Sequence, residues 1–310
     1  MCKIVGIGAN VYDTLITLPY YPAEDTKLRA AEMQETGGGP CATGLVAAAV
    51  LGESCAYIGA LADDAGGRFL KADLERYGVS TEFVTIQAGK QSFSSYIWLS
   101  EASATRTCVF LKTNLPVFTL EQDAIAAIQG AEILMVDGNE LPQAVEGAKI
   151  ARQSGTRVLY DAGGLYDGIE DLLPFADILI PSEEFALGLT GAGTAEGAAK
   201  QLFVRYRPEV VVITCGKKGG ILYDGETIKA YPAFSVSAKD TNGAGDVFHG
   251  AFAFGVARGY SYEKACVFAS AVSALKCTKV GARSGVPDFD TVIKFLKECG
   301  RDEFEKELEK

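Results

Sequence analysis

Short apolar runs rich in β-branched residues recur along the chain, and such runs are typical of buried strands. They are KIVGIGA (3–9), CAYIGAL (55–61), EILMVDG (132–138), RVLYDAG (157–163), DILIPS (177–182) and VVVITCG (210–216). Segments with apolar residues at helical spacing lie between most of them, for example at 41–53, 65–78 and 141–155. Two further helices are expected to begin at Gly243 and Tyr262.

This alternation of strand and helix indicates right-handed crossovers and an α/β fold with a mainly parallel sheet covered on both faces. Ligands of such sheets gather at the carboxyl ends of the strands. The chain has 310 residues and shows no internal repeat or low-complexity linker, so residues 1–310 are interpreted as one compact domain. The tail RDEFEKELEK (301–310) has the amphipathic, charge-rich pattern of a solvated helix.

Two segments, 11–36 and 89–114, interrupt the alternation because they lack long helical patterns. In the second, SFSSYIWLS and TRTCVFLK indicate two strands around the polar turn EASA. We interpret both segments as a small extra β-sheet that acts as a lid over a site. The alternative from periodicity alone is a surface hairpin without function.

Composition and charge narrow the function. The net charge is −11 and Lys and Arg form no cluster, which excludes a surface for nucleic acid. The N-terminal MCKIVGIGANVYD enters an apolar strand directly, without the pattern of a signal or membrane segment, so we expect a cytoplasmic protein without membrane contact. The eight cysteines form no CxxC pair and lie mostly in apolar segments. They predict buried free thiols rather than disulfides or a zinc site.

The stretch KDTNGAGDVFHGAFAFGVARG (239–259) carries the strongest chemical signal. Its apolar part predicts a buried helix whose first turn has unpaired N–H groups, and Gly243, Ala244 and Gly245 keep bulky side chains away from them. Asp246 follows directly, where the helix dipole favours an ionised carboxylate. This pattern suits a general base beside an oxyanion hole that holds a transferring phosphoryl group. The simpler alternative is an aspartate that only complements the dipole.

DTNGAGDVFHGAF closely resembles the DTxGAGD signature of the PfkB, or ribokinase-like, family of carbohydrate and nucleoside kinases. The resemblance extends over nearly the whole chain. It implies a ribokinase-like three-layer α/β/α fold with a small β-sheet lid, ATP as phosphoryl donor and Mg²⁺, with K⁺ as a candidate monovalent cation. It also implies a homodimer formed through the lid.

The resemblance assigns further residues. GGGPCATGLVAAAVLG (37–52) is similar to the first family signature, in which Gly38 and Gly39 let the backbone approach a sugar. Asp13 matches the acidic residue that binds sugar hydroxyls. The nucleotide-binding strand and loop match VVVITCGKKGG, where the matching positions are Thr214, Gly216 and Gly219, while Asn242 with Thr241 shapes the approach to the anion pocket. Taken singly, each glycine pair could be an ordinary loop or turn.

The chain also departs from the family pattern. Ser182 and Phe185 stand in place of the Asn and Glu of the Asn-x-x-Glu motif associated with magnesium-bound phosphate, so no metal ligand is assigned. Thr43 replaces the Asn that often ends the first signature, although it stays a substrate-binding candidate. Asp161 at a strand end is either a metal-water contact or a turn residue. His249 is interpreted as a packing residue, with contact to the catalytic carboxylate as the alternative.

The expected acceptor is a ketose or related carbohydrate. Three stretches resemble the sulfofructose kinase branch of the family most closely: TGGGPCATGLVAAAVLG, DTNGAGDVFHGAF and FASAVSALKCTKVGARSGVPDFD. YPAEDTKLR is similar to ketohexokinase. An anionic sugar would need cationic donors. The candidates are Lys27, Arg29, Arg106, Lys112 and Arg283. Asp137, Asn139 and Glu140 suit hydroxyls better, so a neutral or weakly charged sugar is favoured. Two alternative functions remain open: a nucleoside kinase, and a catalytically silent regulator that binds a sugar or a nucleotide. A dinucleotide oxidoreductase is disfavoured, because GIGANVYD (6–13) lacks the last glycine of the GxGxxG motif.

Overall fold

The computed structural model describes residues 2–103 and 105–304. Within them a nine-stranded sheet has the order β13-β12-β11-β10-β9-β8-β1-β4-β5, and its pairs are parallel from β11 to β5. Only β12 and β13, at one edge, pair antiparallel. The strands are β1 (Ile4–Ile7), β4 (Cys55–Ala62), β5 (Val79–Gln87), β8 (Ile133–Val136), β9 (Arg157–Ala162), β10 (Ile178–Pro181), β11 (Val210–Thr214), β12 (Gly220–Tyr223) and β13 (Ile228–Tyr231). The predicted mainly parallel sheet is therefore confirmed.

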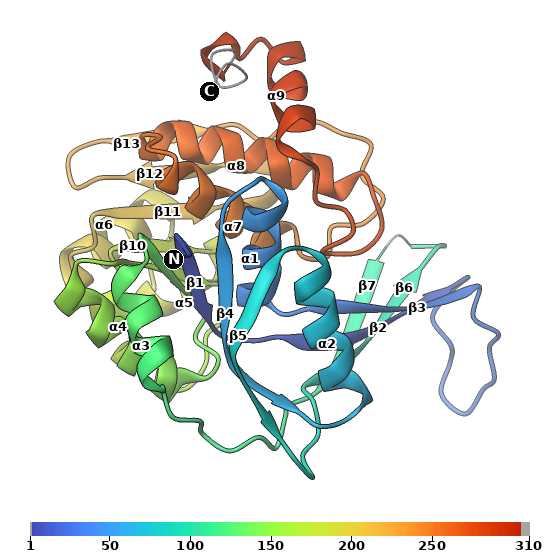
Figure 1. Ribbon diagram of the computed structural model, residues 1–310. Helices are drawn as coiled ribbons and strands as arrows, with labels where there is room; N and C mark the ends of the chain where they lie inside the picture. The colour runs from blue at the N-terminus through green and yellow to red at the C-terminus, as the bar shows by residue number, and fades with distance from the viewer. Residues whose placement is uncertain (1, 104, 305–310) are drawn as a thin grey trace.

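Helices cover both faces of this sheet, which gives the three-layer arrangement in Figure 1. One face packs against α1 (Pro40–Val50), α7 (Ala244–Ala257) and α8 (Tyr262–Cys277), with α2 (Ala65–Arg76) and α9 (Phe289–Glu298) beside them. The other face packs against α3 (Gln122–Gly130), α4 (Leu141–Ser154), α5 (Glu183–Thr190) and α6 (Ala195–Tyr206). Single 3₁₀ turns occur at Ile169–Asp171, Leu173–Phe175 and Gly216–Lys218.

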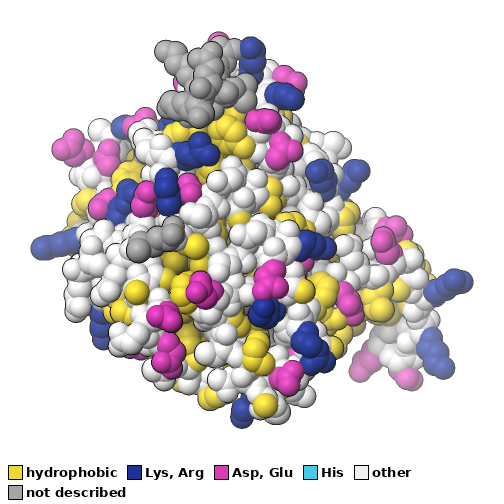
Figure 2. Space-filling model, in the orientation of Figure 1, with side chains coloured by type: hydrophobic (Ala, Val, Ile, Leu, Met, Phe, Trp, Pro, Cys, Tyr) yellow, Lys and Arg dark blue, Asp and Glu magenta, His cyan; other side chains and the backbone are white. Residues whose placement is uncertain are grey.

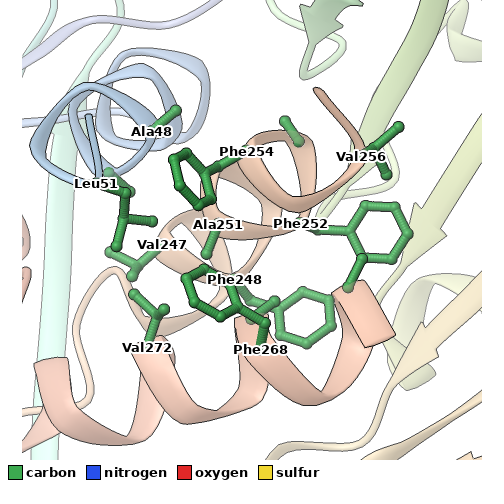
Figure 3. Packing of buried hydrophobic residues seen from close by; sticks show 14 of the residues in the cluster. Ala48, Leu51, Val247, Phe248, Ala251, Phe252, Phe254, Val256, Phe268 and Val272 are labelled. Atoms are coloured by element: carbon green, nitrogen blue, oxygen red, sulfur yellow. The ribbon is translucent and has the colours of Figure 1, made fainter. Parts of the chain in front are cut away.

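Helix α7 is buried on nearly all sides because it lies between α1 and α8 (Figure 3). Phe248, Phe252 and Phe254 project from it into the apolar layer, which explains its lack of an amphipathic pattern. It approaches α1 very closely: a Cβ placed on Gly250 would lie 2.0 Å from the carbonyl oxygen of Gly44. The backbones of the two helices therefore touch at a pair of glycines.

A second, four-stranded sheet has the order β3-β2-β6-β7. Its strands β2 (Val11–Leu18), β3 (Glu32–Gly38), β6 (Ser94–Ser100) and β7 (Thr105–Leu111) come from the two segments that interrupt the sequence pattern. We call it the small sheet; it projects from the body in Figure 1. Residues 105–111 of β7 are all exposed. Its function as a lid stays a prediction.

Some sequence expectations need correction. Cys41, Cys55, Cys266 and Cys277 are buried free thiols, but Cys108 and Cys299 are exposed. The prediction of buried cysteines is wrong for these two because every residue of β7 is exposed and Cys299 follows α9 at the surface. The helix expected at 301–310 lies largely outside the described residues.

The charge distribution agrees with the sequence. On the face in Figure 2, Lys and Arg side chains are interspersed with Asp and Glu. Among the residues described, no helix is long and apolar enough to span a bilayer.

Candidate active site

The first turn of α7 follows a glycine and presents backbone N–H groups at the helix end. Gly243 precedes the helix with φ 74°, in the left-handed region, and a Cβ there would lie 2.6 Å from the Cβ of Ala282. A side chain at this position is therefore excluded both by conformation and by space. The first N–H groups of a helix have no intrahelical acceptor. The N–H of Ala244 donates to the carbonyl oxygen of Thr241 at 3.2 Å, so Gly245 presents the donor that is open to whatever binds in front of the turn.

Asp246 lies in this first turn and is partly buried. Burial, and then the negative charge of Asp137, raise its pKa to about 6, while Lys276 and Arg106 oppose the rise. The helix end favours the ionised form of this carboxylate, as expected for an aspartate in a first turn, but burial has the larger effect on its pKa. A base with a pKa just below neutral is still mostly ionised at pH 7, and it accepts a proton more readily than an ordinary aspartate.

A cavity of about 460 Å³ opens directly beside this turn. Three predicted nucleotide-binding residues, Thr214, Gly216 and Gly219, line it together with Ala244 and Gly245. Gly219 has φ 85°, and a Cβ there would lie 2.2 Å from the carbonyl oxygen of Tyr231. The structure thus brings the β11–β12 loop and the start of α7 to one cavity, although they lie far apart in the sequence.

Asp13 lies on β2 of the small sheet, where it is buried and its Oδ1 accepts a hydrogen bond of 2.6 Å from Ser95 Oγ. Burial raises the pKa of Asp13 to about 6, and Ser95 and Arg283 counteract this. A Cβ on Gly38 would lie 2.0 Å from Asp13 Oδ2, so only glycine lets this carboxylate occupy its place. Ser95 on β6 was not singled out from the sequence, where it is one of several serines in a strand.

Gly39 precedes α1 with φ 90°, and a Cβ there would lie 2.5 Å from the carbonyl oxygen of Ala9. Gly38 and Gly39 therefore make a close backbone crossing at the junction between β3 and α1. This crossing brings the first turn of α1 beside the end of β1, where the N–H of Ala42 donates to the carbonyl oxygen of Ala9. A sugar-binding role for the two glycines stays a prediction.

Asp137, at the end of β8, binds backbone rather than open space. Its Oδ2 accepts hydrogen bonds of 2.9 Å from the N–H groups of Ala9 and Cys41, and its Oδ1 accepts one from the N–H of Asn139. The carboxylate therefore ties β1, the start of α1 and β8 together, and burial raises its pKa. Asn139 beside it is also buried. Asp137 is thus a structural connector, which its sequence position among polar residues did not reveal.

Arg283 is only 1% exposed and its guanidinium is fully engaged. Nη1 donates to Asp73 Oδ2 at 2.7 Å, and Nη2 donates to Asn10 Oδ1 at 2.8 Å and to the carbonyl oxygen of Gly38 at 2.6 Å. The suggestion that Arg283 holds an anionic substrate is therefore wrong, because the buried guanidinium already donates to Asp73, Asn10 and Gly38. Thr43 is also completely buried, with its hydroxyl 3.5 Å from Arg283 Nε.

The other candidate cations are exposed. Lys27 and Arg29 lie in the loop between β2 and β3, which extends beyond the small sheet in Figure 1, and Lys112 follows β7. Arg106 on β7 points toward α7, where its Nη1 donates to Thr241 Oγ1 at 3.2 Å. This contact joins the small sheet to the loop in front of Asp246.

His249 lies one turn into α7 and contacts Asp161 rather than Asp246. Its Nδ1 is 2.6 Å from the carbonyl oxygen of Gly245 and 3.1 Å from Asp161 Oδ2, and its Nε2 is 2.9 Å from the carbonyl oxygen of Ile180. Carbonyl oxygens only accept, so both contacts are hydrogen bonds only when the ring is protonated twice. Burial lowers the pKa of His249 and opposes that state, while the adjacent carboxylate favours it.

Asp161 is the buried carboxylate with the strongest case for contact with a metal or its water. Burial and then the charge of Asp246 raise its pKa well above the ordinary value. Within the described residues its Oδ2 accepts no hydrogen bond of good geometry. The same residues contain no cluster of three or more His, Cys, Asp or Glu placed to hold a metal on their own.

Comparison with known proteins identifies the class. The pfkB family carbohydrate kinase pattern matches residues 3–288, so this chain belongs to the pfkB family of carbohydrate kinases. The chain is 27% identical over 297 residues to the ribokinase of Haemophilus influenzae, covering 94% of this chain and 97% of that protein. It is 24% identical over 302 residues to mouse ketohexokinase, covering 94% and 99%.

The fold comparison agrees. The solved structure of Arabidopsis thaliana ribokinase complexed with ribose and ATP superposes with a TM-score of 0.85 and 25% identity, covering 96% of this chain and 99% of that one. The ribokinase-like α/β fold and the carbohydrate kinase class expected from the sequence are therefore confirmed.

Proposed function

We propose that this chain transfers the γ-phosphoryl group of ATP to a primary hydroxyl of a ketose or related carbohydrate. One observation carries the proposal: the cavity lined by Thr214, Gly216 and Gly219 is also lined by Ala244 and Gly245, directly ahead of Asp246. A nucleotide in this cavity would direct its phosphates toward the free N–H groups of α7. The solved plant ribokinase that contains ribose and ATP supports the choice of ligands.

In this mechanism Asp246 accepts the proton of the sugar hydroxyl. The sugar oxygen forms a new bond to the γ-phosphorus, and the bond from that phosphorus to the bridging oxygen breaks, so that ADP leaves. The N–H groups of Gly243 and Gly245 stabilise the charge on the transferring group, together with the N–H of Ala244 once it leaves the carbonyl oxygen of Thr241. The raised pKa of Asp246 suits this role, because a stronger base takes the proton more readily while it stays largely ionised at pH 7.

The sugar is held on the other side of Asp246 by Asp13, Gly38 and Gly39, with Asn139 nearby. Burial of Asp13 and its hydrogen bond to Ser95 fix the carboxylate in one orientation, which suits recognition of hydroxyl groups. The charge of Asp246 raises the pKa of Asp13, so the two carboxylates lie within electrostatic reach. We assign Thr43 a packing role, since its side chain is completely buried.

A neutral or weakly charged sugar fits this site best. The charged side chains at its centre are acidic, and the donors of the buried Arg283 are already used by Asp73, Asn10 and Gly38. Lys27 and Lys112 lie at the surface, where an ammonium group is well solvated. An anionic group on the sugar would therefore meet repulsion near Asp13 unless the small sheet brought a lysine inward.

Magnesium fits the residues present. Mg²⁺ is commonly held by one or two carboxylates together with substrate phosphates. Asp161 offers a buried carboxylate whose Oδ2 accepts no hydrogen bond from the described residues, with His249 Nδ1 3.1 Å away. Asp161 would hold the ion, directly or through water, and Glu183 at the start of α5 is a second candidate. Bound with ATP, the ion would neutralise charge on the phosphates. Asn242 would flank those phosphates on the protein side.

The small sheet closes the site in this proposal and pairs with a second copy of the chain. Its strands carry large apolar side chains that are exposed, including Met33, Tyr96, Val109 and Phe110. Exposed large apolar side chains gathered on one small sheet support an interaction site there. Closure would exclude water from the transfer step, and Arg106 already connects β7 to Thr241.

The deciding experiment is a panel of neutral ketoses, aldoses, phosphorylated sugars and nucleosides, each assayed for ADP release with ATP and Mg²⁺. We expect a neutral ketose or related sugar to give the highest kcat/KM. Phosphorylation of nucleosides alone would contradict the carbohydrate assignment. Saturable sugar binding without turnover of any acceptor would show a regulator instead of a kinase.

A further inference from the structure

Lys276 is a buried lysine in the last turn of α8, and its side chain is completely inaccessible to solvent. Its Nζ donates hydrogen bonds to the carbonyl oxygen of Asp240, at 3.0 Å, and to the carbonyl oxygen of Asn242. Both carbonyls belong to the loop that leads into α7. An ammonium group is rarely buried without a reason, because its desolvation is costly.

Further hydrogen bonds and an ion pair connect Lys276, Asp240 and the residues next to them. Asp240 Oδ2 lies 3.8 Å from the ammonium and also accepts a hydrogen bond of 2.8 Å from the N–H of Gly281. Asp240 Oδ1 accepts one from the N–H of Asn242, also at 2.8 Å. The N–H groups of Lys239 and Asp240 donate to the carbonyl oxygen of Cys277. The loop is therefore fixed to the end of α8 at several points.

The hydrogen bond from Lys276 to the carbonyl oxygen of Asn242 also fixes the orientation of the next peptide N–H. In a trans peptide the carbonyl oxygen of one residue and the N–H of the next point to opposite sides. Because Lys276 holds the oxygen of Asn242, the N–H of Gly243 must point away from the ammonium. Gly243 begins the turn whose N–H groups form the proposed anion pocket, so the lysine sets the orientation of the first of these donors.

We propose that Lys276 is a positioning residue that acts as a tethered cation, orienting the anion-binding turn before α7 and supplying fixed positive charge behind it. This inference rests on the proposed function and extends it. The lysine does not touch substrate; it acts through the backbone of Asn242 and Gly243. Its charge also favours the ionised form of Asp246, whose pKa it lowers. The tethered ammonium would serve in place of a bound monovalent cation, so we expect activity without K⁺ in the buffer.

Lys276→Met tests both roles, because methionine keeps an unbranched chain but removes the donors and the charge. We expect ATP binding, measured by calorimetry, to weaken at least tenfold while adenosine binding changes by less than threefold. In turnover we expect kcat to fall more than tenfold with the sugar KM little changed. Lys279→Met is the matched control, since Lys279 is an exposed lysine three residues away and should change neither quantity.

The pH profile provides a readout that a purely structural role would not move. Loss of the positive charge should raise the pKa of Asp246, so the acidic limb of the kcat profile should move to higher pH. The other charged groups that act on Asp246 stay in place in the variant; they are Asp13, Arg106, Asp137 and Asp161. Lys276→Gln keeps hydrogen-bond donors without charge, so it should show the displaced limb with a smaller loss of ATP affinity.

Chemical rescue completes the test. In Lys276→Ala, added ethylammonium should restore part of the lost kcat, whereas wild type should not respond to it. A folded Lys276→Met or Lys276→Gln protein with unchanged ATP affinity and an unchanged pH profile would overturn the inference. A wild-type enzyme that is inactive until K⁺ is added would also overturn it. The ATP-binding arm needs no sugar acceptor, so its result separates a failure of this inference from a failure of the proposed kinase activity.

Discussion

Replacement of Asp246 by Asn should separate activity from stability. If Asp246 is the base, kcat should fall about 10²- to 10⁴-fold, the usual contribution of a general base. The fold should gain stability, because the native state holds this carboxylate with a pKa of about 6 instead of 3.8. At about 1.36 kcal/mol for each tenfold change in proton affinity, the ionised group costs about 3 kcal/mol at pH 7.

The pH dependence of this gain follows from the sign of the shift. Between pH 3.8 and about 6 the native state binds more protons than the unfolded state, so stability conferred by Asp246 falls as pH rises. The advantage of the Asn variant should therefore be complete above about pH 6 and disappear below about pH 4. For a chain of this length, about 3 kcal/mol corresponds to a rise in Tm on the order of 5 °C.

The assay pairs thermal unfolding at pH 7.5 and pH 4 with ADP release on the best acceptor of the panel. Asp290→Asn is the matched control, because Asp290 is an exposed aspartate in the first turn of α9 and should alter neither stability nor rate. An Asp246→Asn enzyme within tenfold of wild-type kcat would refute the base assignment. A lower Tm at pH 7.5 would refute the reasoning from burial.

Three further changes test other parts of the site. Gly38→Ala should raise the sugar KM at least tenfold, because the added methyl group must displace the Asp13 carboxylate 2.0 Å away; steady-state kinetics with the best acceptor would show it. Arg283→Met should destabilise the fold by about 3–5 kcal/mol in denaturant titration, since it leaves Asn10 Oδ1 and the carbonyl oxygen of Gly38 without their buried donor and leaves Asp73 with Arg76 as its remaining partner. Phe110→Asp should convert a dimer to monomer in sedimentation velocity, because Phe110 is 64% exposed on the small sheet.

Each of these changes has a matched control. Gly193→Ala adds a methyl group where no atom lies within 4 Å and should be tolerated. Arg68→Met breaks only an exposed ion pair with Asp63 and should cost less than about 1 kcal/mol. Val204→Asp alters an exposed apolar residue on α6 and should leave association unchanged. Equal effects in a test variant and its control would contradict the corresponding argument.

The sequence predicted those strands and turns that a short stretch of residues specifies by itself. Buried parallel strands such as β8 and β11 are continuous apolar runs, and the small residues before Asp246 mark a turn by themselves. The short antiparallel strands β12 and β13 at the sheet edge were not singled out, because the sequence of β12 through β13 lacks a long apolar run.

Long-range pairing limits prediction at the site. Asp137 looked available to a sugar, but its partners Ala9 and Cys41 lie about a hundred residues away in the sequence. Arg283 looked like a surface cation for the same reason, since its contact with Asp73 spans 210 positions. Lys276 has a local sequence signal, because it is a lysine within an otherwise apolar helical segment. That signal could have identified it as a buried charge.

The close crossing of α1 and α7 has a consequence for how the enzyme could change its acceptor. Because the backbones touch at Gly44 and Gly250, the distance between these two helices is fixed at the crossing. Larger or smaller acceptors cannot be accommodated by sliding one helix along the other. Directed evolution toward new sugars should therefore accumulate its productive substitutions in the small sheet and its loops, while libraries that enlarge either glycine should yield mostly inactive protein.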